Sequence, residues 1–210
     1  MSIVWPCPLA VDEYAQMGRA VRVPRLDCPS CLVATVFWSG YWRHVRFAMA
    51  ERKVFIRRVR CRCCGATHAV LPAFLLARRL DAADQAGGVI GQVAAGRGVR
   101  PAAAAAGVPH ATARGWVRRL GSRAGGLAVS FAALAADLGG EVLVPGPDRF
   151  GHAVAAITAA FAAAAALPGW AALGPWRFAS AVTGGSLLAA NASSPWMVIG
   201  SRRFMPPGSP

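Results

Sequence analysis

Two cysteine pairs with the same spacing constrain the fold of this chain more than any other feature. Cys28 and Cys31 form one C-x2-C pair, and Cys61 and Cys64 form a second pair after twenty-nine intervening residues. The first ten residues lack the basic and long apolar segments of a secretory signal, so we expect an intracellular, reducing compartment. In that setting such pairs are typical of metal ligands rather than disulfides. The spacing therefore predicts one tetrahedral site of four thiolates, occupied by a single Zn²⁺ ion.

A closed shell of four thiolates leaves no coordination position for water, so this zinc is predicted to be structural and not catalytic. Metal binding of this kind supplies on the order of 10 kcal/mol to folding. Cys63 could replace a neighbouring cysteine in a shifted register, although a one-residue spacer would strain the turn. His68 could also lie near the ion. We expect Cys63 and Cys7 to be free thiols and His68 to be a surface imidazole.

The pattern of residues predicts an α+β chain in three parts. β-branched and aromatic residues at 32–38, 42–47 and 54–60 predict a small antiparallel zinc ribbon, with Ser39-Gly40 as a turn and a short strand near 21–25. Alanine-rich segments with glycine and proline punctuation follow, and predict a three-helix helix-turn-helix unit beginning with a helix at 82–95. After a linker at 121–126, helices are expected at 127–138 and 154–167. The predicted domains are 1–77 (N-terminal segment and zinc ribbon), 78–123 (helix-turn-helix) and 124–210 (alanine-rich, mainly helical tail).

Positive charge is concentrated in the first part of the chain. Residues 1–123 carry 19 basic and 6 acidic side chains, whereas residues 124–210 carry 4 and 3, out of a total net charge of +14. Such a field favours a polyanionic partner, and nucleic acid is the leading class. Eight cations surround the predicted ribbon with only Glu51 nearby; we expect them to form one face against phosphates, the alternative being that they only solvate the outer face of the sheet. They are Arg43, Arg46, Arg52, Lys53, Arg57, Arg58, Arg60 and Arg62.

Residues 100–120 predict two helices joined by a tight turn. Pro101 suits the first position of a helix, and Gly107 can adopt the left-handed conformation that ends one. In the next helix an apolar stripe recurs at helical spacing, formed by Ala113, Trp116, Val117 and Leu120. His110, Arg114 and Arg118 remain on the outer face, as in a recognition helix that reads the major groove. The full set predicted to contact DNA is His110, Arg114, Arg118, Arg119, Arg100, Arg57 and Arg58.

Several motifs together resemble a known family. They are Cys-Pro-Ser-Cys at 28–31, Gly-Tyr-Trp-Arg at 40–43, the run from Ile56 through Cys-Arg-Cys-Cys-Gly-Ala-Thr-His to Pro72, the Gly-Val-Pro turn at 107–109, and Trp116. Over roughly residues 15–123 the chain is similar to actinobacterial proteins grouped as domain-of-unknown-function family 6431. It also resembles the N-terminal DNA-binding region of insertion-sequence transposases. The resemblance implies four cysteine zinc ligands and DNA binding at transposon ends or promoters, and Cys63 departs from the usual pattern.

No constellation of side chains predicts catalysis. A transposase core needs three carboxylates that hold two divalent metals. After position 123 only Asp137, Glu141 and Asp148 are available, and a solvated helix terminus explains them better. We therefore expect no enzymatic activity.

Residues 150–176 carry no Lys, Arg, Asp or Glu, but Pro168-Gly169 limits their helix to 153–167. Its length of about 22 Å is short of the roughly 30 Å hydrocarbon core, so we expect a buried helix and no membrane partner.

The leading hypothesis is a non-enzymatic, zinc-dependent protein that binds double-stranded DNA, is transposon-associated or transcription-regulating, and lies in the cytoplasm at the nucleoid. A homodimer or a larger transposition or transcription complex is compatible with it. The alternative is an interaction module that docks on a larger enzyme such as a transposase or polymerase.

Overall fold

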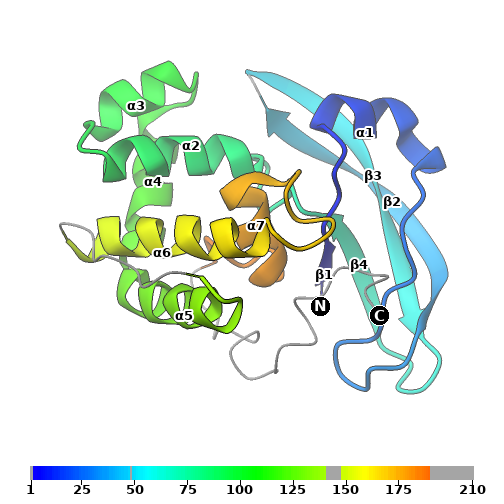
Figure 1. The fold of residues 1–210 in the computed structure, drawn as a ribbon. Helices are drawn as coiled ribbons and strands as arrows, with labels where there is room; N and C mark the ends of the chain where they lie inside the picture. The colour runs from blue at the N-terminus through cyan, green and yellow to red at the C-terminus, as the bar shows by residue number, and fades with distance from the viewer. Residues whose placement is uncertain (1, 48, 141–147, 190–210) are drawn as a thin grey trace.

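A computed structural model describes residues 2–47, 49–140 and 148–189, and these form a mixed α+β fold with one four-stranded sheet and seven α-helices (Figure 1). The sheet region contains β1 (Ser2–Trp5), α1 (Val11–Met17), the 3-10 turn η1 (Gly18–Ala20), β2 (Thr35–Phe47), β3 (Ala50–Cys61) and β4 (Thr67–Pro72). The helical region contains α2 (Ala83–Ala94), α3 (Val99–Ala105), α4 (His110–Gly121), α5 (Ala124–Asp137), α6 (Arg149–Ala164) and α7 (Gly174–Val182).

The sheet has the strand order β1-β4-β3-β2, in which only the β1–β4 pair is parallel. The long β2–β3 hairpin corrects the predicted turn at Ser39-Gly40, because β2 continues through these residues and reverses only after Phe47. A bulge between Phe37 and Ser39 shifts the register instead. Gly40 is needed within the strand because a Cβ there would lie 2.3 Å from Cζ of Phe55. The strand predicted near 21–25 is wrong, since this segment has no strand structure.

Helix α1, which the sequence analysis did not predict, packs beside β3. β4 pairs with β3 only from Arg57 onward, so the earlier half of β3 has an edge that β4 does not cover. The hydroxyl of Tyr14 donates to the carbonyl of Phe55 at 3.0 Å, and the Tyr14 ring meets Phe74 edge-on with centroids 5.2 Å apart. Tyr14 is fully buried, so α1 closes the sheet core at this edge.

The helices lie close to their predicted positions, with three corrections. The predicted helix at 82–95 is confirmed as α2, and Gly107 has a φ of 62°, as expected for the residue that ends a helix. Pro101 is the third residue of α3 and not the first, although its missing N–H still falls in the unpaired first turn. The linker expected at 121–126 is wrong, because α4 ends at Gly121 and α5 begins at Ala124. Helix α7 was not predicted.

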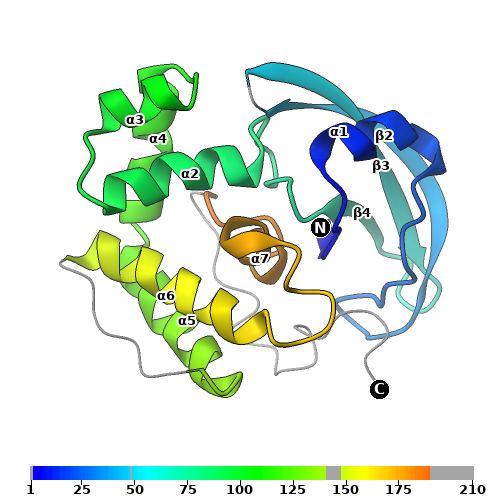
Figure 2. The same cartoon turned by 45° about the horizontal axis from the view of Figure 1, so that its top comes forward.

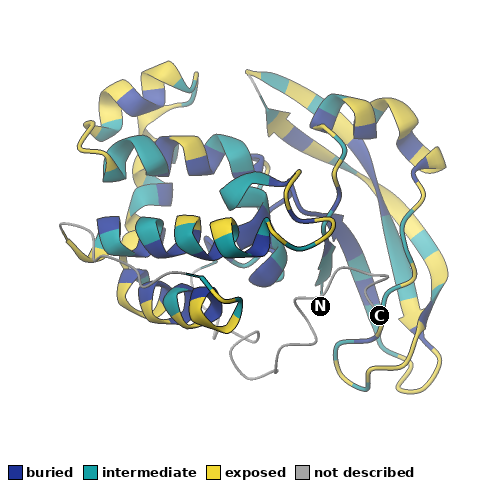
Figure 3. Cartoon of the chain, in the orientation of Figure 1, coloured by how far each residue is buried: buried dark blue, intermediate teal, exposed yellow. Residues whose placement is uncertain are grey.

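One apolar core joins all six helices from α2 to α7 and is rich in alanine. Helix α7 lies between α6 and the sheet in both orientations (Figures 1 and 2), and it contacts α2, α6 and β1. Buried positions of α5 and α6 lie where these two helices face one another (Figure 3). The helix predicted at 153–167 is α6, and five of its residues are buried alanines or isoleucine: Ala153, Ala156, Ile157, Ala160 and Ala164. Within the described residues no helix has the length and apolarity that a membrane span requires.

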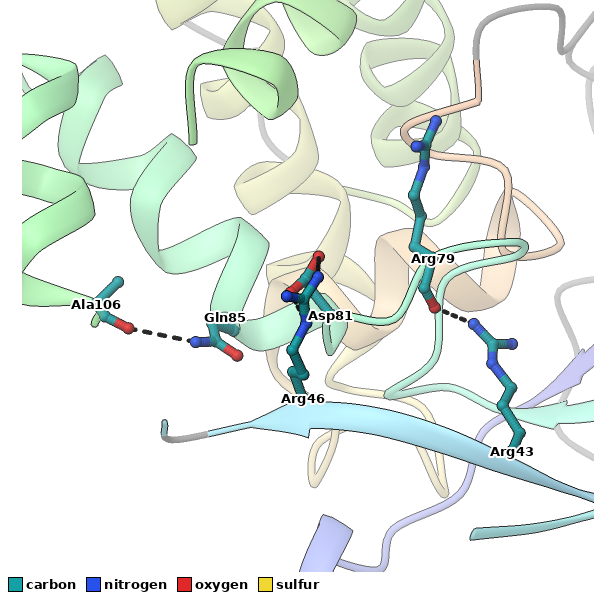
Figure 4. Close-up of polar contacts among 6 residues, drawn as sticks. All are labelled: Arg43, Arg46, Arg79, Asp81, Gln85 and Ala106. Carbon is teal, nitrogen blue, oxygen red and sulfur yellow. Dashed lines mark hydrogen bonds and ion pairs between the residues drawn. The ribbon is translucent and has the colours of Figure 1, made fainter. Parts of the chain in front are cut away.

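Polar contacts fix the hairpin against the helical region (Figure 4). Arg43 of β2 donates to the carbonyls of Leu76 and Arg79, and burial lowers its pKa. Farther along the same strand, Arg46 pairs with Asp81 immediately before α2, with Nε and Oδ1 3.1 Å apart. The backbone of Arg46 also bonds to this loop in both directions. These contacts hold the far end of the hairpin beside the beginning of α2.

Candidate metal centre and neighbouring basic surfaces

The four cysteines predicted from their spacing lie together at one end of the hairpin. The Sγ atoms of Cys28, Cys31, Cys61 and Cys64 all lie within 4.8 Å of one another. Cys31 and Cys61 are 3.3 Å apart, and Cys28 and Cys64 are 3.6 Å apart. Tetrahedral zinc with bonds of about 2.3 Å separates its sulfurs by roughly 3.8 Å. The donor atoms and their spacing therefore fit a single metal ion such as zinc.

The two cysteine turns share one backbone conformation. The N–H of Leu32 donates to the carbonyl of Cys28 at 2.9 Å, and the N–H of Gly65 donates to the carbonyl of Cys61 at 3.2 Å. In both turns the N–H of the first cysteine donates at 2.9 Å to the carbonyl five residues later. Leu32 and Gly65 both have positive φ, 58° and 70°. The first turn therefore adopts at a leucine the same left-handed conformation that the second turn adopts at a glycine. At Gly65, glycine supplies the permissive backbone that this turn requires.

Neighbouring groups shift the pKa values of the four cysteines in opposite directions, lowering those of Cys28 and Cys61 and raising those of Cys31 and Cys64. Burial would raise the pKa of Cys28, but the N–H groups of Ser30 and Cys31, the His68 ring and Cys64 together lower it to about 5. The pKa of Cys31 is raised to about 12, chiefly because its sulfur lies against that of Cys61. Four sulfurs this close share protons unless a cation neutralises them, which is the chemistry a metal ion supplies.

His68 lies inside the site, and the prediction of a surface imidazole is wrong. Its side chain projects from β4, is almost fully buried, and places Nε2 3.5 Å from Sγ of Cys28. The other ring nitrogen, Nδ1, has no hydrogen-bond partner among the described residues. A ring N–H donated to a thiolate orients that ligand, so His68 is an outer partner of the cluster. The sequence placed His68 near the ion only as an alternative, because the β3–β4 pairing that buries it is not visible in the sequence.

The remaining two cysteines are outside the cluster. Cys63 is exposed and is not part of the four-sulfur group, which agrees with the register predicted from the two C-x2-C pairs. Cys7 is fully buried in the sheet core, and burial raises its pKa to about 11. Both are free thiols, as expected.

The eight cations near the hairpin do not form one face, and Glu51 is not their only acidic neighbour. Arg46 pairs with Asp81 and Arg52 pairs with Asp12, whereas Glu51 pairs with His44 at 2.6 Å. Successive residues of a strand point to opposite sides, so the cations of β3 divide between the two faces of the sheet. The sequence did not reveal the ion pairs, because Asp12 and Asp81 come from distant segments.

Arg57 and Arg58, two of the predicted DNA contacts, point to opposite faces and are half-buried. Arg57 donates through Nε to the carbonyl of Val21 at 3.1 Å and through Nη2 to that of Arg19 at 2.9 Å. Arg58 donates to the hydroxyl of Thr67 at 3.0 Å. Both guanidinium groups therefore have structural contacts within the chain.

The other predicted contacts lie on α3 and α4. His110, Arg114 and Arg118 are exposed along α4, while Ala113, Trp116 and Leu120 are buried. Val117 of the predicted stripe is half-buried. Arg119 is half-buried on the same helix, and Arg100 is exposed on α3. The structure thus separates the four-cysteine cluster from α4, with the length of the hairpin between them (Figure 1).

The structure places two of the three carboxylates that were considered for catalysis, Asp137 and Asp148, at helix ends. Asp148 accepts a hydrogen bond from the N–H of Gly151 at 2.7 Å, so it caps the first turn of α6. Asp137 is the last residue of α5. Glu141 lies outside the described residues.

Comparison with known proteins adds one match. Residues 28–116 match the family model of a domain of unknown function, DUF6431. The matched range runs from the first metal-centre cysteine to Trp116 of α4, and it supports the family resemblance seen in the motifs. No curated protein and no solved structure matches the chain.

Proposed function

We propose that this protein is a non-enzymatic DNA-binding protein in which α4 reads the major groove and one structural zinc ion holds the hairpin in shape. The observation that supports this most directly is the exposed side of α4. It carries His110, Arg114 and Arg118, and the helix contains no acidic residue. Within the described part of the chain neither arginine has an ion-pair partner, so both guanidinium groups are free for phosphates or guanine edges.

The packing of α2, α3 and α4 supports a helix-turn-helix. Each of the three helices contacts the other two. The α3–α4 turn contains Gly107 with positive φ, and the side chain of Gln85 on α2 donates to the carbonyl of Ala106 at 3.2 Å. In such units the second helix of the pair enters the groove with its N-terminal residues at base edges. His110 and Arg114 occupy those positions in α4.

The metal centre supports the proposal indirectly. Four cysteines would complete a tetrahedral shell around one ion, so a bound zinc would stabilise the hairpin and leave no open position for substrate. The hairpin is in turn bonded to the loop before α2 through Arg46. A relation to transposases, a regulatory role and nucleoid association are parts of this proposal.

Salt-dependent binding to duplex DNA tests it. Zinc-loaded protein should retard duplex DNA at low salt, with affinity falling steeply as salt rises because phosphate contacts release counterions. Arg114→Ala and Arg118→Ala should each weaken binding to a preferred site by about 5- to 150-fold, the loss typical of one bidentate contact. Arg22→Ala is the matched control, since Arg22 is exposed but lies in the segment between η1 and β2, outside the helices α2, α3 and α4. Absence of binding to any duplex at low salt would overturn the proposal.

Selection of bound fragments from random DNA would refine the role. A palindromic site would indicate a dimeric regulator, and terminal repeats would indicate a mobile element. The alternative function, docking on a larger enzyme, predicts a stable protein partner in a pull-down and little DNA affinity.

A further inference from the structure

A row of aromatic side chains lies on one face of the β2–β3 hairpin, beside the metal centre and away from α4. Trp42 is directly opposite Phe55, and Phe37 is directly opposite Val59. Directly paired residues share a face, as do residues two apart on one strand. Phe37, Phe55 and Trp42 therefore project from the same side. We call these three residues the aromatic row.

Every ring of the aromatic row has a cation against it. Arg57 lies 5.1 Å from the centroid of Phe37, Arg19 lies 5.3 Å from that of Phe55, and Lys53 lies 5.5 Å from a ring of Trp42. Phe55 and Trp42 meet edge-on, with centroids 5.3 Å apart. The two bonds from Arg57 to backbone carbonyls fix its guanidinium over Phe37. Rings and cations thus lie together along one face of the hairpin.

The two outer rings are not used by the core of the protein. Phe37 is 58% exposed and Trp42 is 40% exposed, whereas Phe55 between them is only 8% exposed. Exposed apolar groups that are rimmed by polar or charged residues mark binding surfaces. The outer rings are separated by four residues of β3, or about 13 Å along the strand. This length suits an extended ligand with several flat groups better than one small molecule.

The charge around the aromatic row defines the chemistry of that ligand. None of its three cations, Arg19, Lys53 and Arg57, has an ion-pair partner among the described residues, whereas the neighbouring carboxylates of Asp12 and Asp81 are already paired with Arg52 and Arg46. The Glu51 carboxylate is occupied by His44, whose Nδ1 lies 2.6 Å away. An apolar protein partner would not require such an excess of cations beside the rings. Unpaired nucleic acid presents both a flat base for each ring and a phosphate for each cation.

We propose that the aromatic row binds a single strand of nucleic acid, with unpaired bases stacked on Phe37 and Trp42 and phosphates held by Arg57, Lys53 and Arg19. This site is separate from the proposed duplex site on α4 and does not depend on it. The stacking is tolerant of sequence, because every base has a flat face.

The experiment compares zinc-loaded full-length protein on four fluorescent probes of equal length: an oligothymidine, an oligouridine, an abasic oligomer with the same phosphates, and a duplex. A length of about 16 nucleotides covers the usual range of site sizes. Oligothymidine should bind at least about 5-fold more tightly than the abasic oligomer, the smallest change that loss of one stacked base produces. Equal affinity for the two probes would overturn the proposal. The oligouridine arm decides whether the strand is DNA or RNA.

Variants localise the binding. Phe37→Leu and Trp42→Leu keep apolar volume but remove the ring, and each should weaken oligothymidine binding by about 5- to 100-fold while leaving the abasic probe unchanged. Tyr41→Leu is the matched control, because Tyr41 is also exposed on β2 but pairs with Ile56 and so faces the other side.

Zinc content and the melting temperature check that the variants fold, and Phe37→Leu carries the test if Trp42→Leu proves unstable. Equal weakening by Tyr41→Leu would overturn the assignment to this face. Arg114→Ala should leave single-strand binding intact, which separates this result from the duplex proposal.

Discussion

The sheet region and the helical region of this protein are stabilised in different ways. The buried cluster of the sheet region is formed mainly by large side chains such as Tyr14, Ile56 and Phe74, but it is small. The cluster of the helical region is larger, and 14 of its 29 buried residues are alanines. Each buried alanine removes little apolar surface from water, so this second core depends on how closely the helices approach.

This difference indicates where each region is sensitive. A thin core of large residues needs an additional constraint, and the sheet region has one in the four-cysteine cluster at the end of its hairpin. Closely packed helices need no metal, but they tolerate added volume poorly. The two regions should therefore respond oppositely to metal removal and to small increases in side-chain size.

Loss of the metal should have the largest effect, and it should be confined to the sheet region. Zinc removal, by a chelator or by Cys28→Ser, should remove the metal-binding free energy that stabilises the fold, which is on the order of 10 kcal/mol. Amide hydrogen exchange should rise throughout β2 and β3 and change little in α5 and α6. Cys63→Ser should keep the metal, because Cys63 is outside the cluster. A hairpin that stays protected after chelation, or metal loss in Cys63→Ser, would contradict the comparison.

Arg177 connects the two regions, and its removal should weaken that connection. It pairs with Asp84 on α2, with Nε and Oδ2 2.6 Å apart, and donates to the carbonyl of Leu9 at 3.0 Å. The Arg177 side chain is only 12% exposed. Arg177→Met should cost about 1.5–3 kcal/mol, since it removes hydrogen bonds from a charged group. Denaturant unfolding should then show two separated transitions; a single transition of unchanged midpoint would argue against this role.

Added volume in the helical region should destabilise it at one glycine and not at the next. A Cβ on Gly87 would lie 2.0 Å from Cγ of Trp176 on α7, whereas a Cβ on Gly88 meets no atom within 4 Å. Gly87→Ala should cost about 1–3 kcal/mol by overpacking. Gly88→Ala should stabilise α2 by up to about 1 kcal/mol, because alanine is the better helix former. Thermal unfolding measures both, and equal shifts would rule out close α2–α7 packing.

Removal of a helix cap should have the smallest effect. Asp148→Ala removes the acceptor for the N–H of Gly151 and should cost about 1 kcal/mol. Asp148→Asn should retain most of that stability, since asparagine caps equally well. If Asn were as destabilising as Ala, the charge and not the cap would be the important property of Asp148. Urea unfolding resolves a difference of this size.

Local patterns in the sequence determined the elements whose physical causes are local. The two C-x2-C pairs specified all four residues of the metal centre, because a short spacer by itself places two sulfurs on one side of a turn. Gly107 and the stripe of Ala113, Trp116 and Leu120 specified the α3–α4 turn and the buried side of α4. The proposed roles in DNA binding follow from these local patterns and stay predictions.

Only the tertiary structure decided the features that depend on distant partners. The parallel pairing of β1 with β4 joins segments more than sixty residues apart, and the sequence of neither strand indicates its partner. Burial of His68 against Cys28 depends on the same sheet. The bulge after Phe37 sets the register that places Phe37 on the same face as Trp42. A one-residue shift reverses every side chain of a strand, so composition could identify the aromatic and basic residues but not the face on which they meet.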